Sequence, residues 1–289
     1  IHIKNNRWKE GSFPNTLEGE KVFTITKDHI EKSLLKYPNL KGTFETYIDW
    51  DEDNYFESMK TAEILLTWDF PNKNISKIAP NLKWIHCIGA GVEHLHPFDW
   101  LPENLKLTNN KGIHSKKAGE YGLMTILMMH NHFPKIISNQ HNQIYNSLYS
   151  TPLEGQNIII IGTGSLGGSV AKLLKPFDAN VIGINREGNN VDGCQKIYTY
   201  EELDKILPEA DIIYIALPET PETKNLINNK RLNLLKKTCG IINVGRQSAV
   251  DYKILISKLK EKKLAGAILD VFSSEPIKKG DDLWKVPNL

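Results

Sequence analysis

Three glycines in the segment Gly162-Thr163-Gly164-Ser165-Leu166-Gly167 have the spacing that binds dinucleotides. The first glycine permits a tight turn, the second lets a pyrophosphate approach the backbone, and the third lets the next helix pack closely on the strand. Amides at the start of that helix would meet the phosphate charge. Ordinary glycine-rich turns share the motif, so alone it is weak evidence. Here an apolar strand at 157–161 precedes it and an expected helix follows, and this context predicts a nicotinamide dinucleotide.

Two residues at the end of the next expected strand bear on which dinucleotide is used. NAD-preferring sites usually place Asp or Glu there, to accept hydrogen bonds from the ribose. This chain has Asn185 and Arg186, which remove the charge that would repel a 2′-phosphate and add one that can pair with it. We therefore expect NADP to be preferred. NAD stays possible, because Glu187 could neutralise the arginine or serve the ribose itself.

Strands recur along the chain at spacings suited to βαβ units, which predicts an α/β protein with parallel sheets. The chain has 289 residues, too many for one typical core, so two domains are expected. We place the boundary at the polar turn Asn109–Gly112, giving domains of residues 1–110 and 111–289. In the second domain five strands of a Rossmann sheet can be counted, and a sixth is expected after residue 289. The expected strands are 62–67, 82–88 and 105–108 in the first domain, and 157–161, 180–184, 211–216, 240–244 and 265–270 in the second.

A helix expected at 117–132 is apolar on nearly every face. Such a helix needs cover from more than its own sheet, so we expect it to be buried between domains or against a second subunit. A homodimer is the predicted assembly.

Charge, apolar runs and cysteine spacing bear on which kinds of partner and compartment to expect. A net charge of +2 gives no reason to expect nucleic acid or an anionic membrane, and no apolar run approaches the ~18 residues of a membrane span. The cysteines Cys87, Cys194 and Cys239 lie far apart, which fits a reducing compartment and no metal site. We expect a cytoplasmic protein with a small-molecule substrate.

The second half of the chain resembles the D-isomer-specific 2-hydroxyacid dehydrogenase family in three ordered segments, LEGQNIIIIGTGSLGGSVAKLL, ALPETPETKNLINNKRLNLLKKTCGIINVGRQSAVD and AGAILDVFSSEPIKKGDDLWKVPNL. Earlier, LKWIHCIGAGVEHL resembles the family's substrate-domain loop, and AGEY at 118–121 resembles the start of its inter-domain helix. The resemblance implies a flavodoxin-like substrate-binding domain before the NAD(P)-binding Rossmann domain. It also implies reversible hydride transfer between NADP(H) and a small 2-oxo or D-2-hydroxy acid.

Roles for individual residues follow from the resemblance. Arg246 would bind the substrate carboxylate and polarise the carbonyl, which suits a planar, permanently charged guanidinium. Glu275 would orient the catalytic histidine and favour its protonated form. Backbone amides of Ala90, Gly91 and Val92 would hold the substrate carboxylate. The expected cofactor-binding residues are Gly162, Thr163, Gly164, Ser165, Leu166, Gly167, Asn185, Arg186, Leu217, Pro218, Thr220 and Asp270.

The chain departs from the family pattern in two ways. The family's catalytic histidine lies in a Thr-Pro-His segment just beyond the sequence that here ends at Leu289, and all nine histidines lie at or before His141. We expect both ends of the natural protein to extend beyond this chain, with His114 structural rather than a replacement acid. Gln247 stands where the family usually has glycine. A non-catalytic dinucleotide sensor or interaction protein on the same fold stays an alternative, as does an oxidoreductase of formate-like anions.

Overall fold

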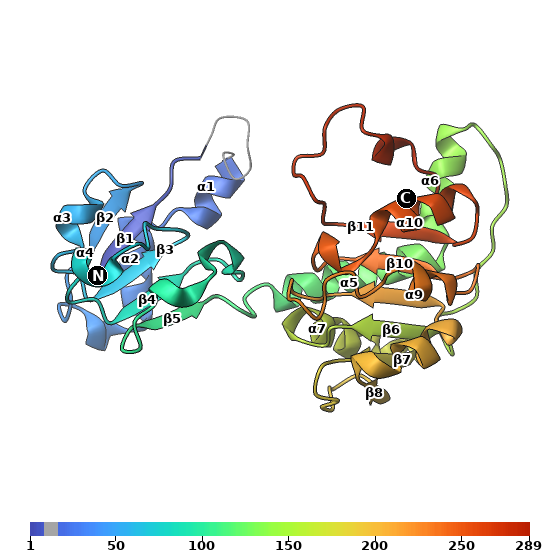
Figure 1. Cartoon of the computed structure of the whole chain (residues 1–289), viewed down its shortest axis with the longest axis horizontal. Helices are drawn as coiled ribbons and strands as arrows, with labels where there is room; N and C mark the ends of the chain where they lie inside the picture. Colours follow the sequence, from blue (N-terminus) through green and yellow to red (C-terminus); the bar gives the residue numbers. More distant parts are fainter. Residues whose placement is uncertain (9–16) are drawn as a thin grey trace. The chain divides into compact units, whose positions relative to one another are not determined.

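The computed structural model describes residues 1–8 and 17–289, and these form two compact units, Ile1–Ile113 and His114–Leu289 (Figure 1). Each unit contains its own parallel sheet with helices packed against it. The units are described separately below. In the part of the chain so described, no helix combines the length and apolar character that a bilayer crossing requires.

The first unit is built on a five-stranded parallel sheet in the order β2-β1-β3-β4-β5. This order is that of flavodoxin-like folds, so the predicted fold of the first domain is confirmed. Sequence patterns identified β3, β4 and β5 but missed β1 and β2, which are four-residue strands. The strands are β1 (His2–Asn5), β2 (Tyr47–Trp50), β3 (Ile64–Thr67), β4 (Trp84–Cys87) and β5 (Lys106–Asn109).

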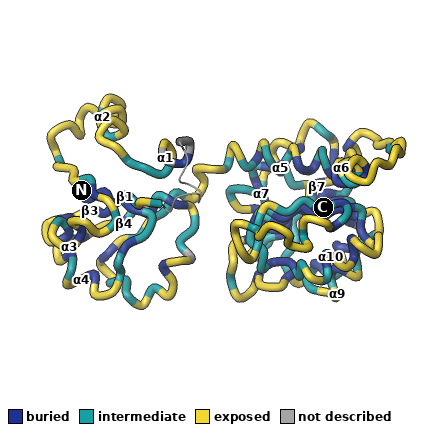
Figure 2. The backbone as a smooth tube through the Cα atoms, turned by 90° about the horizontal axis from the view of Figure 1, so that it is seen from above, coloured by how far each residue is buried: buried dark blue, intermediate teal, exposed yellow. Residues whose placement is uncertain are grey.

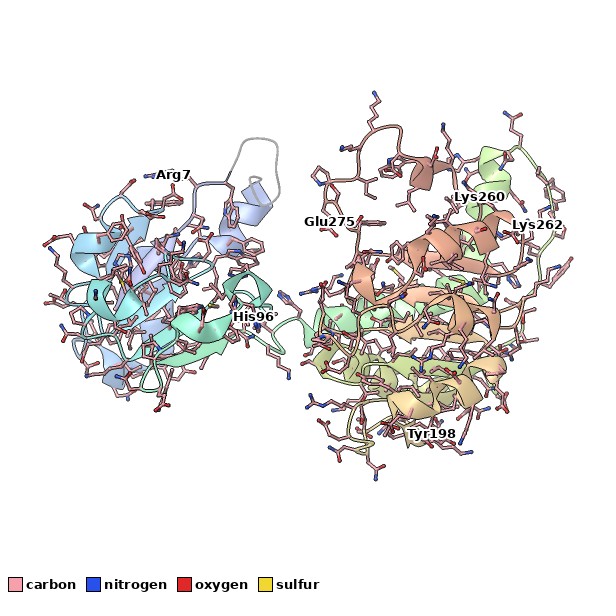
Figure 3. All side chains as sticks on the ribbon, viewed as in Figure 1. Arg7, His96, Tyr198, Lys260, Lys262 and Glu275 are labelled. Atoms are coloured by element: carbon pink, nitrogen blue, oxygen red, sulfur yellow. The ribbon has the colours of Figure 1, made fainter. Side chains whose placement is uncertain are left out.

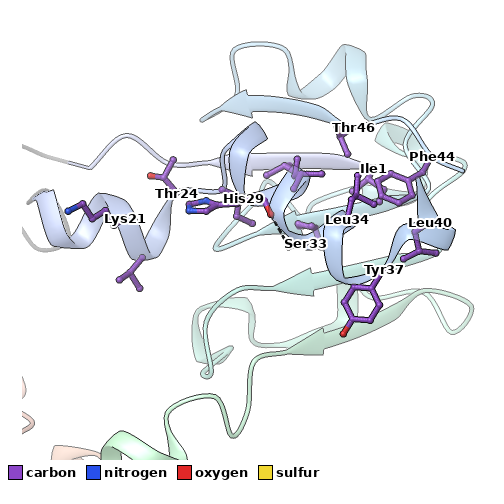
Figure 4. A pocket seen from close by; sticks show the side chains of 15 residues that line it. Ile1, Lys21, Thr24, His29, Ser33, Leu34, Tyr37, Leu40, Phe44 and Thr46 are labelled. Atoms are coloured by element: carbon purple, nitrogen blue, oxygen red, sulfur yellow. Dashed lines mark hydrogen bonds between the residues drawn. The ribbon is translucent and has the colours of Figure 1, made fainter. Parts of the chain in front are cut away.

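The helices of the first unit are unequally packed. Tyr55, Met59, Leu65 and Ile85 form a fully buried core, whereas α2 contains no buried residue (Figure 2). Beneath α2 lies a cavity of about 510 Å³, apolar at one end and edged by Lys21, Thr24 and His29 at the other (Figure 4). The elements are α1 (Leu17–Phe23), α2 (Lys27–Lys36), α3 (Tyr55–Ser58) and α4 (Ile75–Ile78), with 3₁₀ turns η1 (Pro38–Leu40), η2 (Glu93–Leu95) and η3 (Phe98–Trp100).

The second unit has a six-stranded parallel sheet in the Rossmann order, β11-β10-β9-β6-β7-β8. The expectation that the sixth strand would follow residue 289 is wrong, because β8 supplies it inside the chain. Three residues are too few to show a periodic pattern, which is why β8 escaped sequence analysis. The strands are β6 (Asn157–Ile161), β7 (Asn180–Ile184), β8 (Lys196–Tyr198), β9 (Ile212–Ile215), β10 (Gly240–Asn243) and β11 (Gly266–Leu269).

The isoleucine run of β6 lies at the centre of this sheet and is buried on both faces. Ile158 and Ile160 pack into one core cluster and Ile159 and Ile161 into the other, each with 0% exposure. Helices on both faces of a parallel sheet explain why the strand is continuously apolar rather than alternating. The surrounding elements are α5 (Ser115–His130), α6 (Phe133–His141), α7 (Ser165–Leu174), α8 (Leu203–Ile206), α9 (Asn229–Asn233) and α10 (Tyr252–Lys260), with 3₁₀ turns η4 (Lys175–Phe177), η5 (Tyr200–Glu202), η6 (Leu207–Glu209), η7 (Gln247–Ala249) and η8 (Asp282–Lys285).

Helix α5 covers one face of the sheet and crosses α7 at close range. A Cβ built on Gly119 would lie 3.1 Å from Leu173 Cδ1, and one built on Gly122 would lie 2.3 Å from Val170 Cγ2. The two glycines therefore allow the helices to approach each other. One face of α5 is buried within its own unit, while Met124 on another face is 46% exposed.

Candidate functional site

The turn between β6 and α7 has the geometry that each of its glycines was expected to provide. Gly162 adopts φ +93°, and a Cβ there would lie 2.6 Å from the carbonyl oxygen of Ala216. A Cβ on Gly167 would come within 2.1 Å of the Gly162 oxygen, so the helix and the turn touch. A Cβ on Gly164, in contrast, would meet nothing within 4 Å. The open space at the second glycine is where a pyrophosphate would approach.

The start of α7 presents free hydrogen-bond donors to that space. Gly164 is the N-cap residue of α7, and no side chain caps this end of the helix. Within residues 1–8 and 17–289, the amides of Gly164, Ser165 and Leu166 donate to no protein acceptor. Unpaired amides at a helix N-terminus bind anions, and the helix dipole favours negative charge there. The residues present therefore fit a dinucleotide pyrophosphate.

Asn185, at the end of β7, closes a loop above this turn. Its Nδ2 donates to Thr163 Oγ1 at 3.0 Å and to the Asn189 carbonyl at 2.9 Å, and its Oδ1 accepts from the Asn189 amide at 3.1 Å. Both polar atoms of the Asn185 side chain are thus hydrogen-bonded within the loop. The side chain is neutral, so it adds no negative charge at the end of β7.

Arg186 is 76% exposed and pairs with its neighbour Glu187. Its Nη2 and Nε lie 2.7 Å and 3.0 Å from Glu187 Oε1, and this hydrogen bond raises the pKa of the guanidinium above its ordinary value. Exposed ion pairs of this kind contribute little to stability, so the arginine can leave Glu187 for a stronger partner.

The loop after β9 carries Leu217, Pro218 and Thr220 beside the glycine turn. Leu217 is 2% exposed, and a Cβ on Gly245 would come within 2.5 Å of its backbone nitrogen and oxygen. The Thr220 amide donates to Thr223 Oγ1 at 2.9 Å, and that hydroxyl donates to the Pro218 carbonyl at 2.7 Å. These bonds hold the loop as a closed turn at the same sheet edge as Gly162.

Arg246 follows the carboxyl end of β10, where Asn243 fixes its backbone. Asn243 is 0% exposed; its Nδ2 donates to the Arg246 carbonyl at 3.1 Å, and its Oδ1 accepts from the Gly245 amide at 3.1 Å. The guanidinium is half-buried, and its Nη1 donates to the Gly245 carbonyl at 3.0 Å. Gln247, next in the chain, lines a cavity of about 350 Å³ with Tyr252 and the segment 272–274.

The next strand brings Asp270 to the same edge. The Asp270 amide donates to the Asn243 carbonyl at 3.0 Å, and its carboxylate accepts from the Tyr121 hydroxyl at 3.1 Å. Burial, together with the charge of Asp270, raises the pKa of Tyr121. The glycine turn, Arg246 and Asp270 thus follow the carboxyl ends of β6, β10 and β11 at one edge of the same parallel sheet.

Glu275 lies on the exposed loop after β11 (Figure 3). Its Oε1 accepts a hydrogen bond from the Phe272 amide at 2.9 Å, which folds the carboxylate back onto the segment that begins at Asp270.

In the first unit, the predicted carboxylate-binding loop follows β4. The Asn109 side chain donates to the Ala90 carbonyl at 2.7 Å. In the described part of the chain the amides of Ala90, Gly91 and Val92 have no protein acceptor, so three adjacent donors are available to an anion. Behind the loop, Trp68 lies 2.9 Å from the Cβ position of Gly89, so glycine is needed for this packing.

Sequence analysis missed the residues that support this site. Asn243 and Tyr252 hold the Arg246 turn and the segment after β11, and Trp68 stacks on His94 behind Gly89 with ring centroids 6.0 Å apart. The asparagine in the apolar expected strand 240–244 was a usable signal, because a polar residue there needs hydrogen-bond partners. Among the residues described, no group of three or more His, Cys, Asp or Glu side chains is arranged to hold a metal ion.

Comparison with known proteins gives a consistent result. Residues 123–289 match the family model of the D-isomer specific 2-hydroxyacid dehydrogenase, NAD binding domain. The chain is 38% identical to a glyoxylate reductase of Pyrococcus horikoshii over 266 residues, covering 86% of this chain and 79% of the relative. It is 32% identical to a glyoxylate reductase of Thermofilum pendens over 237 residues, covering 80% and 70%.

Solved structures share the fold across nearly the whole chain. A D-isomer specific 2-hydroxyacid dehydrogenase family protein from Aeromonas salmonicida is 29% identical with a TM-score of 0.74, covering 100% of this chain and 86% of that one. A family member from Xanthobacter autotrophicus, in complex with NADPH and MES, has a TM-score of 0.77 at 24% identity, covering 99% and 85%. These relatives do not favour the alternative of a non-catalytic sensor. The chain belongs to the D-isomer specific 2-hydroxyacid dehydrogenase family and is an oxidoreductase that uses a nicotinamide cofactor.

Proposed function

We propose that the protein reduces a small 2-oxo acid to the D-2-hydroxy acid, with NADPH as the preferred cofactor. The observation that carries this proposal is the placement of Arg246 at the carboxyl end of β10, with its backbone fixed by the buried Asn243. Open α/β sheets bind ligands at this edge. A guanidinium held there can pair with the substrate carboxylate and draw electron density toward the carbonyl oxygen.

The remaining chemistry is divided among groups of the second unit. When bound, reduced nicotinamide supplies a hydride to C2 of the 2-oxo acid. Glu275 is proposed to orient the catalytic histidine of this family, and to raise its pKa so that it can protonate the carbonyl oxygen. The amides at the start of α7 would hold the pyrophosphate, and Asp270 would lie beside the carboxamide.

We assign the first unit to substrate binding. The unpaired amides of Ala90, Gly91 and Val92 support this assignment, since a carboxylate would satisfy all three donors. The net charge of +2 gives no support for a nucleic-acid or membrane partner, and a small anion is the substrate class that the loop fits.

The preference for NADPH is supported by Asn185 and Arg186. Asn185 places no carboxylate near a 2′-phosphate, and an arginine–phosphate pair would replace the weak Arg186–Glu187 contact. Charge-assisted hydrogen bonds contribute about 1.5–3 kcal/mol, more than an exposed ion pair.

A homodimer is the proposed assembly, formed through the outer face of α5. A hollow of about 650 Å³ there is lined mainly by Leu123, Met124, Leu127, Met128 and Phe133. Apolar side chains gathered at one exposed hollow favour a protein partner. A cytoplasmic location is proposed because Cys87, Cys194 and Cys239 are all free thiols.

Steady-state assays of the full-length protein test the proposed function. Glyoxylate, hydroxypyruvate, pyruvate and branched 2-oxo acids would each be offered with NADPH and with NADH. We expect turnover of at least one acid and a higher kcat/KM with NADPH. Absence of turnover with every acid and both cofactors would contradict the proposal.

A further inference from the structure

We propose that the hydroxyl group of Tyr252 is a positioning group for the 2-oxo acid site, because it ties the turn that carries Arg246 to the segment that carries Asp270 and Glu275. The inference rests on the roles proposed above for Arg246 and Glu275. It adds a residue that acts through others and touches neither substrate nor cofactor.

Both hydrogen-bonding functions of this hydroxyl are in use. Tyr252 Oη accepts from Asn243 Nδ2 at 3.0 Å and donates to the Val271 carbonyl at 3.0 Å. The same Asn243 amide group donates to the Arg246 carbonyl. A continuous chain of hydrogen bonds therefore runs from Arg246 through Asn243 and Tyr252 to Val271.

Through Val271, Tyr252 holds the segment 270–275, which carries Asp270 and Glu275. Val271 follows Asp270, whose amide donates to the Asn243 carbonyl, and precedes Phe272, whose amide donates to Glu275 Oε1. Asn243 thus holds this segment twice, directly at Asp270 and through Tyr252 at Val271. Loss of the tyrosine hydroxyl would remove the second of these two links and leave the direct bond between Asp270 and Asn243.

The environment keeps the hydroxyl protonated and able to donate. Burial is the largest cause and raises the pKa of Tyr252 far above its ordinary value; the hydrogen bond from Asn243 opposes this rise, and the charges of Asp270 and Glu275 add to it. The competing explanation is that Tyr252 is the first residue of α10 and only packs its ring there. A phenylalanine would pack equally well, so the hydroxyl is the group to test.

The experiment compares Tyr252→Phe with Tyr214→Phe in the full-length protein. Tyr214 is a fully buried tyrosine of the same unit, and its hydroxyl has no partner within the described residues, so the control removes the same atom without breaking a bond. Measured quantities are kcat and KM for glyoxylate and hydroxypyruvate, the Kd of NADPH, the Tm, and amide hydrogen exchange of peptides covering 243–246 and 271–275.

For Tyr252→Phe we expect kcat/KM to fall on the order of 10-fold or more, because small displacements of catalytic groups are costly. The Kd of NADPH should be unchanged, and exchange at 271–275 should be faster. In an Arg246→Lys background the same substitution should cost less, since the two residues act as one unit. Tyr214→Phe should match the parent in kinetics and in exchange.

Parental kinetics and exchange in Tyr252→Phe would overturn the proposal, as would an equal loss of kcat/KM in Tyr214→Phe. An inactive Arg246→Ala variant combined with a fully active Tyr252→Phe variant overturns this inference alone. Parental kcat/KM in Arg246→Ala overturns the proposed function, and with it the claim that Tyr252 positions that arginine.

Discussion

Arg246 supplies the charge proposed to bind the substrate, and Asn243 holds the backbone turn that carries Arg246. The role of the guanidinium was implied by the family resemblance, and the structure puts Arg246 just after the carboxyl end of β10. The hydrogen bonds of Asn243 were not predicted, because they reach Tyr252 in α10 and Asp270 after β11, and the sequence does not show that these residues lie beside Asn243. The Arg186–Glu187 pair was foreseen as one of two roles for Glu187, since adjacent opposite charges can meet without any knowledge of the fold.

The role of Arg246 can be tested with two substitutions. Arg246→Ala should lose most of its kcat/KM for 2-oxo acids while NADPH affinity is kept, because carboxylate pairing and carbonyl polarisation disappear together. Arg246→Lys should recover little, since a point charge cannot reproduce the planar fork. Steady-state kinetics and NADPH titration of the full-length protein check both. Near-parental kcat/KM in the alanine variant would refute the assignment.

Cofactor choice should respond to Arg186 alone. Replacing it with alanine should weaken NADPH binding by about 1.5–3 kcal/mol, the range for a charge-assisted hydrogen bond, and leave NADH nearly unchanged. The preference should also shrink as salt rises, because the arginine is exposed and its pair with phosphate would be screened. Calorimetric titration at two salt concentrations measures both effects. Equal weakening of the two cofactors would show that Arg186 does not bind the 2′-phosphate.

Among the elements, five of the six strands of the second unit were predicted within one residue at each end, and β6 and β7 at their observed bounds. Their apolar runs are long because both faces of the sheet are covered. The missed strands β1, β2 and β8 have three or four residues, and β1 contains His2, Lys4 and Asn5, which are buried but polar. Burial of polar residues depends on tertiary partners, so composition alone could not assign β1.

Replacing either of two glycines with alanine should have different effects, one on stability and the other on cofactor binding. Gly122→Ala should destabilise the protein by about 1–3 kcal/mol, because its Cβ would overlap Val170 across the α5–α7 contact. Gly164→Ala should leave the Tm unchanged but weaken NADPH binding, since its Cβ enters only the space proposed for the pyrophosphate. Thermal unfolding and cofactor titration distinguish the two. Unweakened NADPH binding in Gly164→Ala would contradict the placement of the cofactor.

Strand β1 should make the first unit sensitive to acid. His2 is 1% exposed, and neither ring nitrogen has a hydrogen-bond partner among the residues described. Burial lowers its pKa below the ordinary value of 6.5, against the opposing charge of Asp49 and with the N-terminus and Lys4 adding to the shift. The neutral imidazole is therefore favoured by folding. Stability should be full above pH 6.5 and should fall as the pH drops from there through the folded-state pKa.

Denaturant unfolding between pH 7.5 and 5 measures this dependence. His2→Phe should reduce it, because phenylalanine does not titrate and can pack beside Tyr47 and Tyr55. His96→Gln, which changes an exposed histidine of the same unit, should keep it. An identical pH dependence in His2→Phe and the parent would rule out His2 as its source.

At the scale of the whole molecule, two sheets of different strand order were predicted from the alternation of strands and helices, together with the family resemblance, and both are present. The outer surface of α5 belongs to this scale too. Its apolar character was visible in the sequence, but only the structure separates the face buried in its own unit from the face left exposed.

Light scattering should show a dimer at micromolar concentration. Met124→Lys should shift the equilibrium toward monomer, because it places a charge in the proposed apolar interface at a position that is 46% exposed in the chain itself. Lys116 is exposed at the start of the same helix, and Lys116→Glu serves as the charge-changing control. A monomeric parent protein would contradict the proposed assembly.

The loose packing of α2 has a practical consequence. A helix with no buried residue, lying over a cavity of about 510 Å³, gains little from its neighbours and should open locally long before the sheet unfolds. Limited proteolysis of the native protein should therefore cut there early, and an inserted peptide or a dye on Leu35, which is 82% exposed, should be tolerated. Helix α2 offers a place to attach a reporter that leaves the glycine turn, Arg246 and Tyr252 unaltered.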